Sequence, residues 1–418
     1  MDKFIIHGGK KLKGAVEIGG AKNAVLPIMA ATIIHGGKYR LLNVPRLKDT
    51  ITMKKLLEIV GASINYNGNV MDIDTRNCNT PIAPYDLVKT MRASFYVLGP
   101  FLSRFERAEV SLPGGCAWGP RPVNYHLQAI ESMGGTVDLT DGMIVVKGKM
   151  HGAEITFENS SVGATGNTLM AAVMAEGVTI INNAAKEPEI ESLCEFLIKM
   201  GASISGVGTS ILTVTGMQSL NADIEYTVIP DRIEAGTFLI AGACTFGDVT
   251  VNNVYPNHLE ILLLMLKEVG FDIEINDTSI RIQSSNNFIK SKDMETDIYP
   301  GFPTDLQAQW MSLMSIANGR SKITENVYKD RFTHIAELNR FGAKIELDRN
   351  IAHTEGIDQF KGAPVMSTDI RASASLIIAA LSAKGKSIIS RIYHIDRGYE
   401  NIEEKFKILG ANIERINF

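Results

Sequence analysis

The sequence predicts an α/β protein built from six copies of one small module. The first observation is a glycine that follows an apolar residue and precedes a short run leading to Ile or Val, as in "MGASISG" from residue 200. It recurs at intervals of 67–73 residues, as Gly61, Gly134, Gly201, Gly270, Gly342 and Gly410. The second observation is a helix of small apolar residues upstream of each glycine. Two landmarks in register six times argue against chance similarity.

The upstream landmark predicts a central helix followed by a strand in every copy. In order, the six segments read "KNAVLPIMAATIIHGGKYRLLNV", "RASFYVLGPFLSRFERAEVSL", "ATGNTLMAAVMAEGVTIINNA", "EAGTFLIAGACTFGDVTVNNV", "LQAQWMSLMSIANGRSKITENV" and "RASASLIIAALSAKGKSIISRI". A helix that is apolar on all sides is buried, and its Ala, Gly and Ser residues allow close packing. We therefore expect these six helices at the centres of their domains.

A second helix in each copy ends at the periodic glycine. The segments "MKKLLEIVG", "EFLIKMG" and "LLLMLKEVG" have helical apolar spacing, and the glycine is the expected C-terminal cap in the left-handed conformation. The alternating residues after the glycine predict strands. One copy therefore reads strand–helix–strand–helix–strand–strand. Such a unit is longer than a solenoid repeat, so each copy is a small α/β module.

Composition narrows the class of function. The chain has 418 residues, 45% hydrophobic and 21% charged, which predicts a soluble protein of two or more domains. A net charge of −4 argues against a nucleic-acid or membrane-surface partner. The start "MDKFIIHGGK" lacks the apolar core of a signal peptide, and "ILLLML" at 261–266 is too short to cross a bilayer. We expect a cytoplasmic protein. The four cysteines have neither metal-ligand nor disulfide spacing.

The loops between the two landmarks carry the chemically unusual residues. In order they read "NVPRLKD", "SLPGGCAWGPRPVN", "NNAAKEPE", "NNVYPNH", "ENVYKDRFTH" and "SRIYHIDRGYE". The second loop holds Cys116 and Arg121 between glycines and prolines, which exclude a helix or a central strand. Other polar residues stand at the starts of the central helices: Lys22-Asn23, Arg92, Ser161, Asp231-Arg232, Asp305 and Asp369-Arg371. Equivalent positions in a repeat predict that the charged ones converge, where helix N-termini also favour anions.

Eight motifs cover the chain from end to end: "GGAKNAVLPIMAA", "MRASFYVLGP", "LPGGCAWGPRPVNYHL", "SVGAT", "YPGFPTDLQAQ", "ENVYKDRFTHIAEL", "DIRASASL" and "DRGYENIEEKF". Together they resemble the enolpyruvyl transferases, and within them the UDP-N-acetylglucosamine 1-carboxyvinyltransferase family. The resemblance implies two inside-out α/β barrel domains, each a threefold βαβαββ repeat, that close over a cleft. The implied first domain spans residues 21–229, and the second spans 230–418 and is completed by residues 1–20.

The resemblance also implies a reaction. The enolpyruvyl group of phosphoenolpyruvate passes to the 3′-hydroxyl of UDP-N-acetylglucosamine by addition and then elimination of phosphate, with no cofactor or metal. This is the first committed step of peptidoglycan synthesis. Cys116 matches the family's general acid, which also forms a covalent adduct with phosphoenolpyruvate, and Asp305 matches the carboxylate that takes the hydroxyl proton. The remaining catalytic positions are Lys22, Asp369 and Arg397.

Two sets of binding residues follow from the same resemblance. Phosphoenolpyruvate is expected at Lys22, Asn23, Arg121, Arg331, Arg371 and Arg397. UDP-N-acetylglucosamine is expected at Arg92, Arg121, Pro122, Val123, Asn124, Tyr125, Ser161, Val162, Gly163, Asp305 and Val327. Two positions depart from the family pattern. Asn159 stands where some members have Lys, and Asn124 stands where Asp is expected.

Three alternatives remain open at this point. Asp305 is also a natural N-cap for the helix "LQAQWMSLM", and both roles can hold together. The related enolpyruvylshikimate-phosphate synthases share the fold and the use of phosphoenolpyruvate, although "LPGGCAWGPRP" and "NYHLQAI" favour the nucleotide sugar. A nucleotide-sugar sensor without activity would be a different class of protein, against which the combination of Lys22, Cys116, Asp305 and Arg397 argues.

Overall fold

The structure, a computed structural model of the whole chain, describes residues 2–112, 123–284 and 288–417. The chain divides into two compact units: unit 1 is Met1–Gly19 with Pro230–Phe418, and unit 2 is Gly20–Ile229. Gly20, assigned to the N-terminal strands in the expected division, is grouped with unit 2. Each unit has its own hydrophobic core. Among the described residues, no helix has both the length and the apolar character needed to cross a membrane.

Unit 2 contains three modules of the predicted kind. The first comprises β14 (Ile224–Thr227), α1 (Lys22–Ala31), β3 (Lys38–Leu42), α2 (Lys48–Val60), β4 (Ser63–Asn67) and β5 (Val70–Asp74). The second comprises β6 (Ile82–Ala83), α3 (Tyr85–Val88), η1 (Arg92–Val97), α4 (Leu98–Phe105), β7 (Arg107–Ser111), α5 (Asn124–Ser132), β8 (Thr136–Thr140) and β9 (Met143–Lys147). The third comprises β10 (Glu154–Thr156), α6 (Val162–Ala172), β11 (Val178–Asn182), α7 (Pro188–Lys199), β12 (Ser203–Ser205) and β13 (Ile211–Thr215).

Unit 1 repeats the arrangement three times more. Its first module comprises β2 (Lys13–Glu17), α8 (Arg232–Cys244), β15 (Asp248–Asn252), η2 (Pro256–Leu259), α9 (Glu260–Glu268), β16 (Asp272–Ile275) and β17 (Ser279–Gln283). Its second comprises β18 (Met294–Glu295), η3 (Thr304–Leu306), α10 (Gln307–Met314), β19 (Arg320–Thr324), α11 (His334–Arg340), β20 (Lys344–Asp348) and β21 (Ile351–Glu355). Its third comprises β22 (Pro364–Met366), α12 (Ile370–Ser382), β23 (Lys386–Ser390), η4 (Ile392–Arg397), α13 (Ile402–Ile408), β24 (Asn412–Ile416) and β1 (Lys3–His7).

Every module forms one four-stranded sheet with the same topology. A parallel pair is followed by an antiparallel hairpin, as in the order β10-β11-β13-β12. Three positions are filled by strands distant in sequence. β14 is the edge strand of the first module of unit 2, β2 is the edge strand beside β15, and β1 lies between β23 and β24. Both ends of the polypeptide therefore contribute to the last sheet of unit 1.

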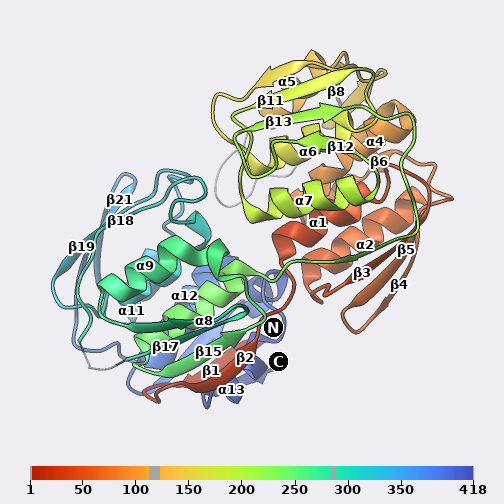
Figure 1. Cartoon of the computed structure of the whole chain (residues 1–418). Helices are drawn as coiled ribbons and strands as arrows, with labels where there is room; N and C mark the ends of the chain where they lie inside the picture. The colour runs from red at the N-terminus through yellow and green to blue at the C-terminus, as the bar shows by residue number, and fades with distance from the viewer. Residues whose placement is uncertain (1, 113–122, 285–287, 418) are drawn as a thin grey trace. The chain divides into compact units, whose positions relative to one another are not determined.

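The central helices are buried within each unit, and the fold belongs to the predicted α/β class. Figure 1 shows α8 and α12 enclosed by the strands of unit 1. Almost every residue of α8 and α12 is buried, and α10 packs against both helices. Close packing explains the small residues. A Cβ on Gly236 of α8 would meet Leu306 at 2.6 Å, and one on Gly99 of α4 would meet the carbonyl oxygen of Asn167 at 2.4 Å.

The periodic glycines have the backbone conformation that the sequence pattern predicts. All six have positive φ, from 87° at Gly410 to 113° at Gly61. Each follows the second helix of its module, and the first strand of the hairpin begins shortly after it. The cost of a Cβ in this conformation explains why glycine recurs at this position.

Candidate functional site

A charged cluster of unit 1 is centred on Asp305, in the η3 turn before α10. Its Oδ1 lies 2.7 Å from Arg331 Nη1, and its Oδ2 lies 2.8 Å from Arg371 Nη2. Arg331 precedes α11, and Arg371 lies in the first turn of α12. The cluster thus joins residues of two successive modules. The prediction that charged residues at the starts of the central helices converge is confirmed for Asp305 and Arg371.

The pKa of Asp305 is held well below its usual range. Burial by itself would raise this pKa, but the positive charges of Arg371 and Arg331, with the hydrogen bonds that each donates, outweigh burial. The carboxylate is therefore ionised at neutral pH. The sequence also allowed Asp305 to cap the helix that follows it. This role is not observed, because neither η3 nor α10 has a side-chain cap at its N-terminus.

Arg371 is a buried cation with an unused donor. Its side chain is 5% exposed, and its guanidinium lies 5.5 Å from the centre of the Tyr399 ring. Burial would lower its pKa, but Asp305 and Tyr399 keep the group charged. Its Nη1 has no hydrogen-bond partner among the described residues. A buried N–H group of this kind normally has a partner, so this unmet donor makes Arg371 a candidate anion-binding residue.

Asp369 serves as the N-cap of α12. Its Oδ1 accepts hydrogen bonds from the backbone N–H of Arg371 at 2.8 Å and of Ala372 at 3.3 Å. Capping holds the first turn of α12, and thereby the backbone of Arg371, in a fixed position. Arg397 is half-buried at the end of η4, and Val327 is 45% exposed beyond β19.

In unit 2, the predicted phosphoenolpyruvate residue Lys22 is the first residue of α1. Lys22 is 8% exposed, and its Nζ lies 2.7 Å from Oδ2 of Asp49, which is buried at the start of α2. The neighbouring Asn23 is exposed, and Arg92 is half-buried at the start of η1. The ammonium group of Lys22 is thus held beside a buried carboxylate at the start of α2.

The predicted nucleotide residues of unit 2 lie at the starts of α5 and α6. Ser161 caps α6, where its Oγ accepts a hydrogen bond from Ala164 N at 3.3 Å. A Cβ on Gly163 would lie 3.1 Å from His126 Cε1, so α6 approaches α5 closely here. Tyr125, which precedes His126 in α5, accepts a hydrogen bond of 3.0 Å at its Oη from Asn159 Nδ2. The departure at Asn159 thus has a partner within the predicted site.

His126 is a neutral ring that connects these helices. Burial, with a contribution from the positive charge of Arg92, lowers its pKa to about 3. The Nδ2 of Asn167 lies 2.9 Å from its Nδ1, and the Phe95 ring packs edge-on at 4.9 Å. Asn167 Oδ1 accepts from Gly99 N, so its Nδ2 is the donor and His126 Nδ1 the acceptor.

The remaining predicted residues belong to two groups. Val123 and Val162 are half-buried and Asn124 is exposed, all beside the helix starts just described. Cys116, Arg121 and Pro122 lie outside the described residues, and their roles stay predictions.

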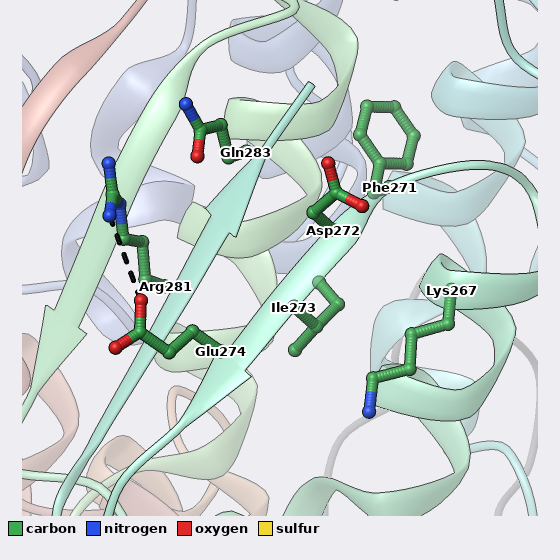
Figure 2. Close-up of a pocket in the computed structure, with 7 residues that line it drawn as sticks. All are labelled: Lys267, Phe271, Asp272, Ile273, Glu274, Arg281 and Gln283. Carbon is green, nitrogen blue, oxygen red and sulfur yellow. Dashed lines mark ion pairs between the residues drawn. The ribbon is translucent and has the colours of Figure 1, made fainter. Parts of the chain in front are cut away.

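Among the described residues of unit 1, one pocket lies apart from Asp305 and another lies beside it. One, of about 460 Å³, lies on β16, β17 and α9 and is shown in Figure 2. Its charged residues are two of each sign: Lys267, Asp272, Glu274 and Arg281. A second pocket, of about 330 Å³, is lined by residues that include Pro303 and Leu306 on either side of Asp305. Arg232, one of the charged residues noted at the helix starts, lines the second pocket, whereas no residue predicted to bind a substrate lines either pocket.

Sequence reasoning missed several polar residues of the site. Asp49 pairs with Lys22, Glu325 bonds to the turn before Asp305, and Tyr399 lies beside Arg371. All three belong to the six equivalent loops, in "NVPRLKD", "ENVYKDRFTH" and "SRIYHIDRGYE". Aligning the loops by repeat would have identified them as candidates. Such an alignment would not have shown which residue each of the three contacts.

Known proteins similar to this chain are carboxyvinyltransferases. A family model described as EPSP synthase (3-phosphoshikimate 1-carboxyvinyltransferase) matches residues 6–406. The chain is 52% identical over 419 residues to a UDP-N-acetylglucosamine 1-carboxyvinyltransferase of Pelodictyon phaeoclathratiforme, covering 99% of this chain and 98% of that protein. It is 50% identical over 417 residues to the protein of the same description from Geotalea daltonii, covering 100% of both.

Solved structures share the fold. The enolpyruvyl transferase NikO from Streptomyces tendae has a TM-score of 0.91 at 24% identity, covering 99% of this chain and 98% of that one. An EPSP synthase from Acinetobacter baumannii has a TM-score of 0.76 at 18% identity, covering all of both chains. At these identities the likeness concerns the fold alone.

Proposed function

The chain belongs to the EPSP synthase family, and because its relatives at half identity over the full length are UDP-N-acetylglucosamine 1-carboxyvinyltransferases, we propose that it catalyses their reaction. It is a transferase that moves the enolpyruvyl group of phosphoenolpyruvate to the 3′-hydroxyl of UDP-N-acetylglucosamine and releases phosphate. This reaction is the first committed step of peptidoglycan synthesis.

The unpartnered Nη1 of buried Arg371 carries the proposal at the level of the site. Phosphoenolpyruvate bears a phosphate and a carboxylate, so it needs fixed cations that still have free donors. Arg371 has such a donor, and Arg331 lies on the other side of the same carboxylate. Together with Lys22, Asn23, Arg121 and Arg397, these residues are proposed to bind phosphoenolpyruvate.

Asp305 is proposed to take the proton from the 3′-hydroxyl of the sugar. Its pKa, held well below the usual range by two arginines, makes it an ionised but weak base. An anion bound to Arg331 and Arg371 competes with Asp305 for their N–H donors. Phosphoenolpyruvate would therefore raise the pKa of Asp305 and make it a stronger base when both substrates are present.

The addition step places a proton on the methylene carbon of phosphoenolpyruvate while the sugar oxygen bonds to the adjacent carbon. Cys116 is the proposed donor, because a thiol with an ordinary pKa near 8.5 is mostly protonated at neutral pH. Its thiolate can also form a covalent adduct with the same substrate. Elimination then removes a proton from the new methyl group and breaks the carbon–oxygen bond to phosphate. Asp369 stays a proposed participant beside its observed capping role.

The nucleotide sugar is proposed to contact the starts of α5 and α6 in unit 2. Backbone N–H groups at the start of α6 suit its diphosphate, since the first turn of a helix leaves donors unsatisfied. Arg92 and Arg121 are proposed to supply positive charge to this site. The other proposed contacts are Pro122, Val123, Asn124, Tyr125, Ser161, Val162, Gly163, Asp305 and Val327.

A phosphate-release assay tests the function directly. We expect release from phosphoenolpyruvate with UDP-N-acetylglucosamine as acceptor and none above background with shikimate 3-phosphate. Preference for shikimate 3-phosphate would assign the chain to the other branch of the family. Binding of the nucleotide sugar without any release would indicate a sensor. A cytoplasmic location and the absence of a nucleic-acid partner stay predictions.

A further inference from the structure

Glu325 is a buried carboxylate just beyond β19 that the reaction described above does not use. Its side chain accepts four hydrogen bonds. Oε1 accepts from Thr296 Oγ1 at 2.7 Å, Val327 N at 3.0 Å and Tyr328 N at 2.7 Å. Oε2 accepts from Thr304 Oγ1 at 2.8 Å. Four donors match the acceptor capacity of one ionised carboxylate, so the group is fully satisfied in the interior.

The Oε2 side of Glu325 leads to the charged cluster. Arg331 Nη1 donates to Thr304 Oγ1 at 3.1 Å, and this hydroxyl donates onward to Glu325. Arginine can only donate and a carboxylate can only accept, so the direction of this relay is set by its two ends. The same Nη1 lies 2.7 Å from Asp305 Oδ1. The relay therefore fixes the guanidinium that faces Asp305.

The Oε1 side of Glu325 orders the segment that follows β19. Its bonds to the N–H groups of Val327 and Tyr328 hold a tight turn directly after the strand. Tyr328 O in turn accepts a hydrogen bond of 2.9 Å from Arg331 N. One side chain thus holds the backbone at Val327, the backbone at Arg331 and, through Thr304, the side chain of Arg331.

We propose that Glu325 is a positioning residue that couples the Asp305–Arg331 pair to the turn bearing Val327. It acts through these residues and does not touch substrate. The inference rests on the proposed function. It assumes that Asp305 takes the proton from the sugar, that Arg331 binds phosphoenolpyruvate and that Val327 contacts the nucleotide sugar.

Four variants separate the two sides of Glu325. Thr304→Val removes the relay hydroxyl, and Thr304→Ser restores it. Glu325→Gln keeps one acceptor oxygen, and we expect this oxygen to stay with the three donors that now bond to Oε1. The NH₂ group then faces Thr304 and cannot accept its hydrogen bond, so only the relay is broken. Glu325→Ala removes both sides. Thr245→Val is the matched control. The hydroxyl of this buried threonine of unit 1 donates to Ala241 O and accepts from Leu12 N, and the variant loses both bonds outside the network.

Steady-state kinetics give the expected pattern. Thr304→Val and Glu325→Gln lower kcat about 10- to 100-fold, the range for losing one hydrogen bond to a charged group, with the KM for UDP-N-acetylglucosamine within about twofold of wild type. The double variant is no worse than either single one, since both cut the same relay. Thr304→Ser recovers most of kcat. Glu325→Ala raises the nucleotide-sugar KM as well.

Thermal melts of all variants accompany the kinetics. A kcat for Thr304→Val and Glu325→Gln equal to that of Thr245→Val would overturn the inference. So would losses that add in the double variant, or a Thr304→Ser enzyme as slow as Thr304→Val. Wild-type protein that releases no phosphate with UDP-N-acetylglucosamine would instead refute the proposed function, before any variant is compared.

Discussion

Replacing Asp305 with Asn tests both the stability and the chemistry of the charged cluster. The substitution keeps the shape of the side chain and removes its negative charge. Asp305 is 24% exposed, whereas Arg331 is 12% and Arg371 is 5% exposed. The variant therefore leaves two largely buried guanidinium groups without the carboxylate that neutralises them.

The expected loss in the free energy of unfolding is that of removing one partner from a buried ion pair. Such a loss costs about 3–5 kcal/mol. We take about 3 kcal/mol, because the amide oxygen still accepts one guanidinium bond. For a unit of this size, 1 kcal/mol corresponds to roughly 2–4 °C in Tm, so Tm should fall by roughly 6–12 °C at pH 7. Turnover should fall by about two to four decades, the range for a general base.

The pH dependence has a definite sign. The folded pKa of Asp305 lies below its unfolded value, so the carboxylate stabilises the fold fully above the unfolded pKa of about 3.9. This contribution is lost as pH falls through the folded pKa. The difference in Tm between wild type and Asp305→Asn should therefore be constant from pH 5 to 8 and should shrink only below about pH 4.

Thermal melts, phosphate release and titration with inorganic phosphate measure the three effects. Asp330→Asn is the matched control, because Asp330 is an exposed carboxylate next to Arg331 in sequence. Asp305→Asn should bind phosphate at least about tenfold more tightly than wild type, since the anion no longer competes with a carboxylate. A variant with the Tm of Asp330→Asn and more than a tenth of wild-type activity would refute the reasoning.

Three further predictions concern single residues. Cys116→Asp should retain activity, with a pH profile shifted to lower pH, and should resist an alkylating epoxide, because a carboxylate is a weaker nucleophile than a thiolate. Cys116→Ser should be severely impaired, because a hydroxyl is a far weaker acid than a thiol. An inactive Asp variant beside an active Ser variant would exclude Cys116 as the acid. Gly163→Ala should cost about 1–3 kcal/mol of stability and raise the KM for UDP-N-acetylglucosamine, since its Cβ would lie 3.1 Å from the fixed ring of His126; a wild-type melt and KM would show that the ring can move. Asp49→Asn should raise the KM for phosphoenolpyruvate about tenfold, because Lys22 loses the carboxylate 2.7 Å from its Nζ. The KM for the nucleotide sugar should change little. An unchanged KM for phosphoenolpyruvate would argue that Lys22 does not bind this substrate.

Local patterns in the sequence were sufficient to predict the modules. The cost of a side chain at positive φ acts within a few residues, so the helix ends at Gly61 or Gly410 could be recognised without knowledge of the fold. The burial of the central helices likewise follows from their composition, as α8 shows. Repetition extended this local information to the order of strands and helices in all six modules.

Only the tertiary structure decided how individual groups are used, because charge pairing and shared hydrogen bonds depend on distances between residues far apart in sequence. Asp305 and Asp369 both precede central helices, yet Asp369 caps its helix while Asp305 binds Arg331 and Arg371. The position of β1 between β23 and β24 depends in the same way on which sheet lacks a strand. The sequence by itself therefore determined the repeated architecture and the residues worth testing. The contacts within each unit decided which of them hold a charge, which hold a helix, and which, like Glu325, hold their neighbours in place.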